Sequence, residues 1–146
     1  MAKWTLSPGE AIRKFRVIAV VGASRNPEKD AYTVPRYLRE HGFTVIPVNP
    51  TTESIDGSRC YGSLGDIPLE LARTVEMVDV FRPSDELPGV AEQTVEMKRK
   101  TGRPFLFWAQ LGLENDGAKK TLEEGGIDYV MDSCMRTQHQ LAGLDR

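Results

Sequence analysis

Five short apolar runs, separated by longer segments of mixed polarity, constrain the fold of this chain more than any other feature. Val17-Ile18-Ala19-Val20-Val21 is continuously apolar rather than alternating, as is typical of a strand covered on both faces. The connections between runs are too long for hairpins, and several carry helix signals. We therefore predict an α/β fold, a Rossmann-like doubly wound parallel five-stranded sheet with helices on both faces, in the strand order 3-2-1-4-5. The five runs cover residues 17–21, 43–48, 75–81, 105–108 and 127–131.

Helix signals lie between these runs. Ser7-Pro8-Gly9-Glu10 combines an N-cap hydroxyl, a proline at the first helical position and an acidic residue three positions after the cap, which predicts a helix to about residue 15. Pro35 is compatible with a helix only in its first turn, and Pro47 removes one ladder donor from the second strand. Further helices are expected over 33–41, 85–100 and 114–124, with a short helical turn at 63–66 that begins in a sequence resembling a capping box.

Size and charge exclude several classes of protein. The 146 residues contain no internal repeat or linker, so we expect a single domain over residues 1–146. The 19 basic and 21 acidic side chains nearly cancel, which leaves no global field to hold a nucleic acid or an anionic membrane. The apolar runs are far shorter than the roughly 20 residues that cross a bilayer, and the amino terminus lacks the apolar core of a signal peptide. We expect a cytoplasmic protein that binds neither nucleic acid nor membrane.

The two cysteines, Cys60 and Cys134, have no C-x-x-C spacing. Neither a disulfide framework nor a structural zinc site is therefore expected, and no metal site is predicted. A reducing compartment fits this use of cysteine best.

The end of the first strand is the best candidate for a binding site. It continues into Gly22-Ala23-Ser24-Arg25-Asn26-Pro27, which places a glycine, a hydroxyl and a cation where a Rossmann fold receives a phosphate. Lys29 follows in the same loop and could neutralise a phosphate. In the alternative interpretation Gly22 only turns the chain, Ser24 caps a turn and Lys29 is solvated.

Two absences argue against a dinucleotide. The fingerprint G-x-G-x-x-G is missing, because positions 24 and 27 hold serine and proline. The second strand ends in Val48-Asn49-Pro50, where NAD binding usually needs an acidic side chain for the ribose hydroxyls. An NAD(P)-dependent oxidoreductase or NAD-binding regulator remains the alternative, since fold alone does not exclude it.

The third and fourth strands end at the same predicted rim. Phe81 could line the crevice while Arg82 meets a phosphate oxygen; alternatively Arg82 pairs with Asp79 or Asp85. Trp108 could line a ligand path and Gln110 could bond ligand amides, or Trp108 is simple core packing.

Four segments taken in order, 20–27, 45–50, 78–82 and 108–112, read VVGASRNP, VIPVNP, VDVFR and WAQLG. Together they resemble the small stand-alone CoA-binding proteins, a family similar to the CoA-binding domain of the succinyl-CoA synthetase α subunit, over nearly the whole chain. The resemblance implies CoA or an acyl-CoA, held by its ADP moiety at the carboxyl ends of the strands. It implies the diphosphate at Gly22, Ala23, Ser24 and Arg25 with Lys29 beside it, and the adenosine between Val48, Asn49 and Pro50.

The same resemblance implies a binding module without the ligase domain of the synthetases, because the chain has no room for the phosphorylated histidine and nucleotide-grasping parts. No catalytic residue is assigned, and a protein partner stays open. The segment 131–139 resembles the family segment in which a cysteine follows the last strand, although Ser133 and Gln138 depart from it. Cys134 could exchange with the ligand thiol, but His139, five residues on, does not by itself define a catalytic pair.

Overall fold

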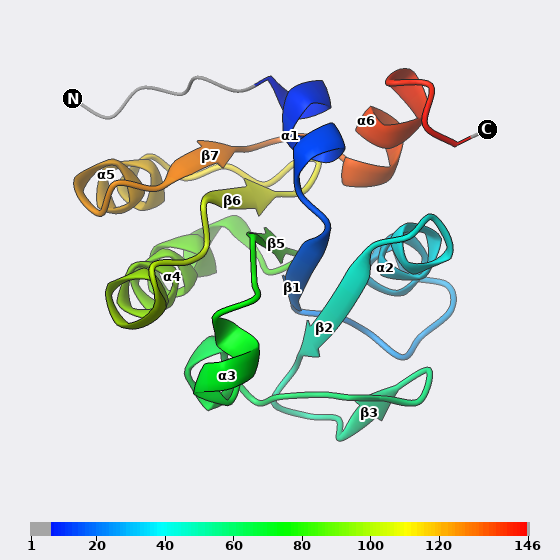
Figure 1. Cartoon of the computed structure of the whole chain (residues 1–146), viewed down its shortest axis with the longest axis horizontal. Coiled ribbons are helices and arrows are strands. Elements are labelled where there is room, and N and C mark those ends of the chain that lie inside the picture. Colours follow the sequence, from blue (N-terminus) through cyan, green and yellow to red (C-terminus); the bar gives the residue numbers. More distant parts are fainter. Residues whose placement is uncertain (1–6, 146) are drawn as a thin grey trace.

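The computed structural model describes residues 7–145, which form a five-stranded parallel sheet with helices on both faces (Figure 1). The Rossmann-like α/β class predicted from the apolar runs is confirmed. Along the sheet the strands lie in the order β2, β1, β5, β6, β7, and every neighbouring pair is parallel. Their bounds are β1 Val17–Val21, β2 Thr44–Val48, β5 Met77–Val80, β6 Leu106–Ala109 and β7 Asp128–Val130.

The predicted strand order, 3-2-1-4-5, is wrong. Counted along the chain, the five main strands lie in the order 2-1-3-4-5, because β5 pairs with β1 and not with β2. After β2 the chain forms a small antiparallel hairpin, β3 Ser54–Ile55 and β4 Ser58–Arg59, and Tyr61 then bridges to Val48 on the outer edge of β2. This segment covers the edge where a third strand was expected, and β2 is therefore an edge strand.

Edge position also explains Pro47. The Pro47 carbonyl accepts a bond of 3.0 Å from the Tyr61 N–H, so it faces the outer edge of the sheet, away from β1. The nitrogen of a strand residue faces the same side as its carbonyl, so the missing N–H also faces outward. Pro47 therefore removes no donor from the β1–β2 ladder, contrary to the expectation from sequence.

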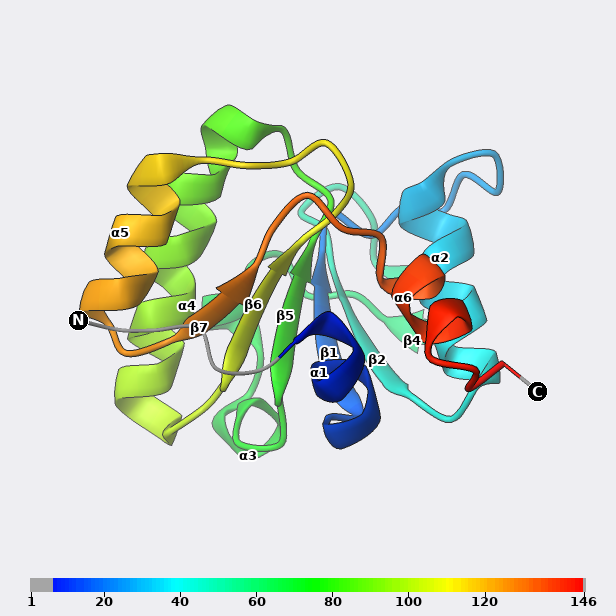
Figure 2. The same cartoon turned by 90° about the horizontal axis from the view of Figure 1, so that it is seen from above.

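Helices cover both faces of the sheet (Figure 2), and two hydrophobic clusters fill the spaces between the sheet and these helices. One face packs against η1 Leu64–Asp66, α4 Leu87–Thr101 and α5 Asp116–Glu124, together with the last residue of α3 Leu69–Ala72. The other face packs against α1 Pro8–Lys14, α2 Asp30–Glu40 and α6 Met135–Leu141. Burial on both faces accounts for the unbroken apolar runs, and all four residues of β5 are buried, including Asp79.

The first helix forms as predicted. The Ser7 hydroxyl oxygen accepts the Glu10 N–H at 3.2 Å, and the Glu10 carboxylate accepts the Ser7 N–H at 3.1 Å, which is a complete capping box. At residues 63–66 the predicted helical turn exists as η1, a 3-10 turn, but Ser63 makes no side-chain cap bond, so the predicted capping box there is wrong. A short 3-10 turn, η2 Ser84–Glu86, leads into α4.

The second predicted helix begins three residues earlier than expected, at Asp30, so Pro35 lies in its second turn. A proline there leaves the carbonyl four residues back, that of Ala31, without its helical donor. In this fold the Ser24 backbone N–H donates to the Ala31 carbonyl at 3.1 Å. The lost helical bond is replaced by one that joins the loop after β1 to α2.

Candidate functional site

The carboxyl ends of β1 and β5 meet at a topological switch point. The chain leaves β1 toward α2 on one face and leaves β5 toward α4 on the other, and open α/β sheets bind ligands in the crevice at such a point. Gly22 ends β1 with a φ of +87°, and a Cβ built on it would lie 3.1 Å from the Phe81 carbonyl carbon and oxygen. Glycine is thus required both by its backbone conformation and by the close approach of the two strand ends.

Local hydrogen bonds fix the loop that follows Gly22. The Ser24 hydroxyl oxygen accepts the Asn26 N–H at 3.0 Å, and the Asn26 side-chain oxygen accepts the Glu28 N–H at 3.0 Å. Ser24 therefore does cap a turn, as in the alternative interpretation, while remaining partly exposed at the surface. The backbone N–H groups of Ala23 and Arg25 have no acceptor within residues 7–145.

Two exposed cations, Arg25 and Lys29, lie in this loop. Neither Arg25 nor Lys29 lies within ion-pair distance of a carboxylate in the described part of the chain. Lys29 is also the N-cap position of α2 and makes no side-chain cap bond, so the positive end of an eleven-residue helix opens beside it. Free cations, free N–H groups and a helix N-terminus converge here, which favours an anion.

The loop after β2 is joined to the first loop by Asn49. Its Nδ2 donates to the Ala23 carbonyl at 2.7 Å, and its Oδ1 accepts the N–H and the hydroxyl of Thr51, each at 2.8 Å. Val48 is buried and contributes its carbonyl, which accepts the Gly22 N–H at 2.9 Å, whereas Pro50 is exposed. Of the three residues predicted here, Asn49 and Pro50 offer side-chain surface to a ligand.

Two cavities adjoin at Asn49. One, of about 520 Å³, lies over the first loop and is lined by Ser24, Arg25, Asn26, Pro27, Asn49, Thr51 and Thr52. The other, of about 490 Å³, lies toward the hairpin and is lined by Asn49, Pro50, Thr52, Glu53, Arg59, Cys60 and Gly62. Both volumes suit a small organic ligand. A third cavity, of about 570 Å³, lies between η1, α3 and α4, and none of the predicted site residues lines it.

The predicted residues after β5 are placed differently from the two loops. Phe81 is half-buried and packs against the α1–α2 face. Arg82 donates from both Nε and Nη2 to one Glu86 carboxylate oxygen, at 3.0 and 2.7 Å. Its charge is therefore partnered by Glu86, one residue beyond the predicted alternative Asp85.

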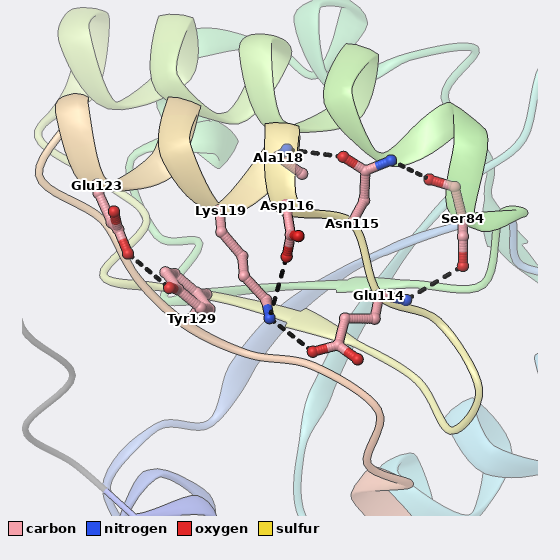
Figure 3. Close-up of polar contacts among 8 residues, drawn as sticks. All are labelled: Ser84, Glu114, Asn115, Asp116, Ala118, Lys119, Glu123 and Tyr129. Atoms are coloured by element: carbon pink, nitrogen blue, oxygen red, sulfur yellow. Dashed lines mark hydrogen bonds and ion pairs between the residues drawn. The ribbon is translucent and has the colours of Figure 1, made fainter.

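A second set of hydrogen bonds holds this rim (Figure 3). Asn115 caps α5 by accepting the Ala118 N–H at 2.9 Å and donates to the Ser84 carbonyl at 3.0 Å, while the Ser84 hydroxyl oxygen accepts the Glu114 N–H at 3.1 Å. Lys119 bonds Glu114 beside it, at 2.6 Å. The loops after β5 and β6 are thus joined to one another.

Trp108 and Gln110 lie behind the crevice. Trp108 has no exposed surface and donates its indole N–H to the Ser133 carbonyl at 2.8 Å, so it packs in the core, as in the alternative interpretation. Gln110 is 5% exposed, and its side-chain oxygen accepts the Met135 N–H at 3.4 Å. These two side chains hold the backbone on either side of Cys134.

Asp79 completes that buried group. Its Oδ1 accepts the Gln110 amide at 2.6 Å, and its Oδ2 has no partner among the described residues. Complete burial raises the pKa of the Asp79 carboxyl to about 7, although the bond from Gln110 opposes the shift. The sequence suggested only one role for Asp79, as a partner for Arg82, although its place between Val78 and Val80 in a predicted strand indicated its burial.

Cys134 and His139 do not form a pair. Cys134 is the half-buried N-cap residue of α6, and no hydrogen bond within residues 7–145 joins it to His139. His139 is buried, and its Nδ1 lies 2.7 Å from the Tyr37 hydroxyl. Desolvation, with a smaller effect of the neighbouring His41, lowers the pKa of His139.

The described residues contain neither a cluster of metal-binding side chains nor a membrane-spanning helix. Across residues 7–145 no three histidine, cysteine or carboxylate side chains gather as a metal ion would require. None of the helices in that range has both the length and the apolar character needed to cross a bilayer.

Comparison with known proteins agrees with the resemblance seen in the sequence. Uncharacterized protein YneT of Bacillus subtilis is 38% identical over 130 residues, or 89% of this chain and 90% of that protein. A hypothetical protein from Pyrococcus horikoshii has a solved structure with a TM-score of 0.83 and 34% identity, covering 94% of this chain and 92% of that one. The alpha subunit of ADP-forming acetate–CoA ligase II from Pyrococcus furiosus is 41% identical over 64 residues, which is 43% of this chain and 14% of the subunit. Residues 16–140 match the family model described as a CoA binding domain, and the chain belongs to that family.

Proposed function

We propose that this protein binds CoA or an acyl-CoA through its ADP moiety, at the carboxyl ends of β1 and β2, and that it does so without turnover of its own. The observation that carries the proposal is the anion site beside α2. Arg25 lines a cavity of about 520 Å³, the backbone N–H groups of Ala23 and Arg25 have no acceptor among residues 7–145, and Lys29 follows in the same loop at the N-cap of α2, in a chain of a CoA-binding family. We infer one CoA-binding domain, matched over residues 16–140.

The diphosphate of the ligand fits the first cavity best. Gly22 and Ala23 lead the chain from β1 to Ser24, which adds a hydroxyl to the lining of this cavity, and the α2 dipole adds to the attraction of the two cations. The adenosine then lies along Asn49, which lines both cavities, and Pro50, which lines the second. Since Arg82 is partnered by Glu86, it would have to change partners to reach a phosphate.

Absence of turnover is proposed on two grounds. The 64 residues that match the ligase alpha subunit cover 14% of that subunit, so the similarity does not extend the activity in that protein's name to this chain. Cys134 and His139 are also held by different partners, Gln110 and Trp108 around the first and Tyr37 at the second. Both cysteines are free, from which we infer a reducing, cytoplasmic setting.

Calorimetric titration with CoA, NAD and NADP in parallel, after removal of copurified ligand, tests the proposal. We expect CoA to bind and the two dinucleotides to bind at least tenfold more weakly. Arg25→Ala and Lys29→Ala should each weaken CoA binding by about tenfold, the value of one charge-assisted contact at an exposed site. Lys120→Ala, an exposed cation on α5, is the matched control and should change nothing. Preference for NAD or NADP would overturn the proposal.

Turnover is tested separately. Acetyl-CoA incubated with the purified protein should remain intact to the same extent as in buffer, as followed by chromatography of free CoA. Release of CoA that depends on the protein would contradict the second half of the proposal and leave the first half standing.

A further inference from the structure

The second cavity contains one cation, Arg59, which extends from strand β4 of the hairpin. Its guanidinium lies over the Tyr61 ring, 5.4 Å from the ring centroid. No carboxylate of residues 7–145 is within 4 Å of it, although Glu53 lines the same cavity. Arg39, packed near the same hairpin, instead pairs with Asp56 at 3.7 Å. Arg59 is thus a charged group without a charged partner, beside a cavity that adjoins the anion site.

Hydrogen bonds fix the position of Arg59 relative to the first cavity. The residue after it, Cys60, donates its N–H to the Glu53 carbonyl at 2.8 Å, which closes the base of the hairpin. Tyr61 then donates to the Pro47 carbonyl at 3.0 Å and accepts the Asn49 N–H at 2.8 Å. The strand that carries Arg59 is therefore joined to the end of β2 and to Asn49, one of the two residues that line both cavities.

We propose that Arg59 binds the phosphate on the ribose of CoA, at the 3′ position, and so lets the site distinguish CoA from ligands that lack this group. The inference rests on the proposed function, which gives the diphosphate to the first cavity and the adenosine to Asn49 and Pro50. The ribose joins these two groups, and in the proposed placement its 3′ phosphate would enter the neighbouring cavity, which shares Asn49 and Thr52 with the first. A guanidinium there can donate two parallel N–H bonds to a phosphate, and stacking on Tyr61 limits its rotamers.

Three features of the second cavity make this more specific than a surface arginine. The cavity has a volume of about 490 Å³, room for a phosphate and part of a ribose. Thr52 lines both cavities and adds a hydroxyl where they join. The phosphate would also neutralise Arg59, the cation of this hairpin, which has no carboxylate partner among residues 7–145.

Dephospho-CoA is the probe, because it differs from CoA only by this phosphate. We expect the wild type to bind CoA about ten- to a hundredfold more tightly than dephospho-CoA, the range of one charge-assisted hydrogen-bonded pair. Arg59→Ala should weaken CoA binding by the same factor and leave dephospho-CoA binding unchanged, so that the two affinities become equal. Arg59→Lys should keep part of the difference. Arg73→Ala, an exposed arginine beyond α3, is the control and should keep all of it.

The outcomes separate this inference from the function beneath it. If the wild type binds CoA and dephospho-CoA equally, CoA binding stands and the role of Arg59 is refuted. If Arg59→Ala weakens both ligands equally, or keeps the difference, Arg59 does not contact the phosphate; loss of the difference in Arg25→Ala instead would assign that phosphate to the first loop. If no CoA binds at all, the proposed function itself fails. Thermal melting of each variant shows that affinity changes do not come from unfolding.

Discussion

The burial of Asp79 predicts how the free energy of unfolding changes with pH. The carboxyl is fully buried in β5, and burial raises its pKa from 3.8 to about 7. Since the folded-state pKa is the higher one, the folded protein holds the proton more tightly than the unfolded chain does. The resulting stability is fully present below about pH 3.8 and is lost as the pH rises to and beyond about 7. A shift of roughly 3 units, at about 1.4 kcal/mol each, corresponds to about 4 kcal/mol.

Asp79→Asn removes the titration and keeps the shape. The asparagine oxygen can still accept the Gln110 amide, while its NH₂ takes the place of the Oδ2 atom that has no partner. Each unpaired buried donor costs about 1–3 kcal/mol, and the NH₂ leaves two N–H donors unpaired where the protonated carboxyl of the wild type leaves one O–H. At pH 4 the variant should therefore be less stable than the wild type by about 1–3 kcal/mol. At pH 9, where the wild type must bury a charge, the variant should be the more stable by about 1–3 kcal/mol.

Urea unfolding, followed by far-ultraviolet circular dichroism at pH values from 4 to 9, measures both proteins. Glu124→Gln, which removes an exposed carboxylate on α5, serves as the control and should run parallel to the wild type. The decisive quantity is the difference in unfolding free energy between wild type and Asp79→Asn, which should change sign within this range. A constant difference would refute the reasoning, because it would mean that Asp79 titrates alike in the folded and unfolded states.

Three further changes test the site and its supports. Gly22→Ala should destabilise the fold by about 1–2 kcal/mol or more, because φ is +87° and the added Cβ would meet the Phe81 backbone. The variant should also lose CoA binding. Thermal melting measures the stability, and an unchanged melting temperature would contradict the prediction. Trp108→Phe should lower the free energy of unfolding by about 1–3 kcal/mol, because it leaves the Ser133 carbonyl unpaired. It should also speed alkylation of Cys134. Equal alkylation rates would show that the indole hydrogen bond does not hold the segment around Cys134. Pro35→Ala should give the Ala31 carbonyl a helical N–H donor that competes with the Ser24 N–H. CoA affinity, measured by calorimetry, should therefore fall severalfold without loss of stability. Unchanged affinity would mean that the Ser24 bond does not fix the conformation of the loop.

The strands, and the position of the loops after β1 and β2 at the carboxyl ends of the strands, were predictable because their signals are local. A continuous apolar run such as Val17–Val21 indicates a buried strand wherever it lies, and the residues after it necessarily reach the carboxyl rim. Strand order was not predictable in the same way. Both 3-2-1-4-5 and 2-1-3-4-5 satisfy right-handed crossovers, and the choice depends on which face the chain crosses after β2.

The hairpin that covers β2 did leave a signal. Asp56-Gly57 occupies its turn with φ values of +50° and +81°, and Asp-Gly between short strands is a strong hairpin pattern. This pattern predicts a hairpin beside β2, which makes β2 an edge strand and places Arg59 near the loop that follows it. The partner of Arg82 was less accessible to sequence reasoning, because Asp85 and Glu86 are both near in sequence and the turn η2 decides between them.

The hydrogen bond between the Ser24 N–H and the Ala31 carbonyl, which Pro35 makes possible, affects the entropy that a ligand would lose on binding. A glycine-containing loop that is mobile in the free protein must be ordered when a ligand arrives, and that loss of entropy is subtracted from the affinity. Here the ordering occurs during folding, since the proline leaves the Ala31 carbonyl available only to the Ser24 N–H. A ligand bound as proposed would then meet a preformed surface, and the free energy of its contacts with Arg25 and Lys29 would contribute to affinity rather than to ordering the loop.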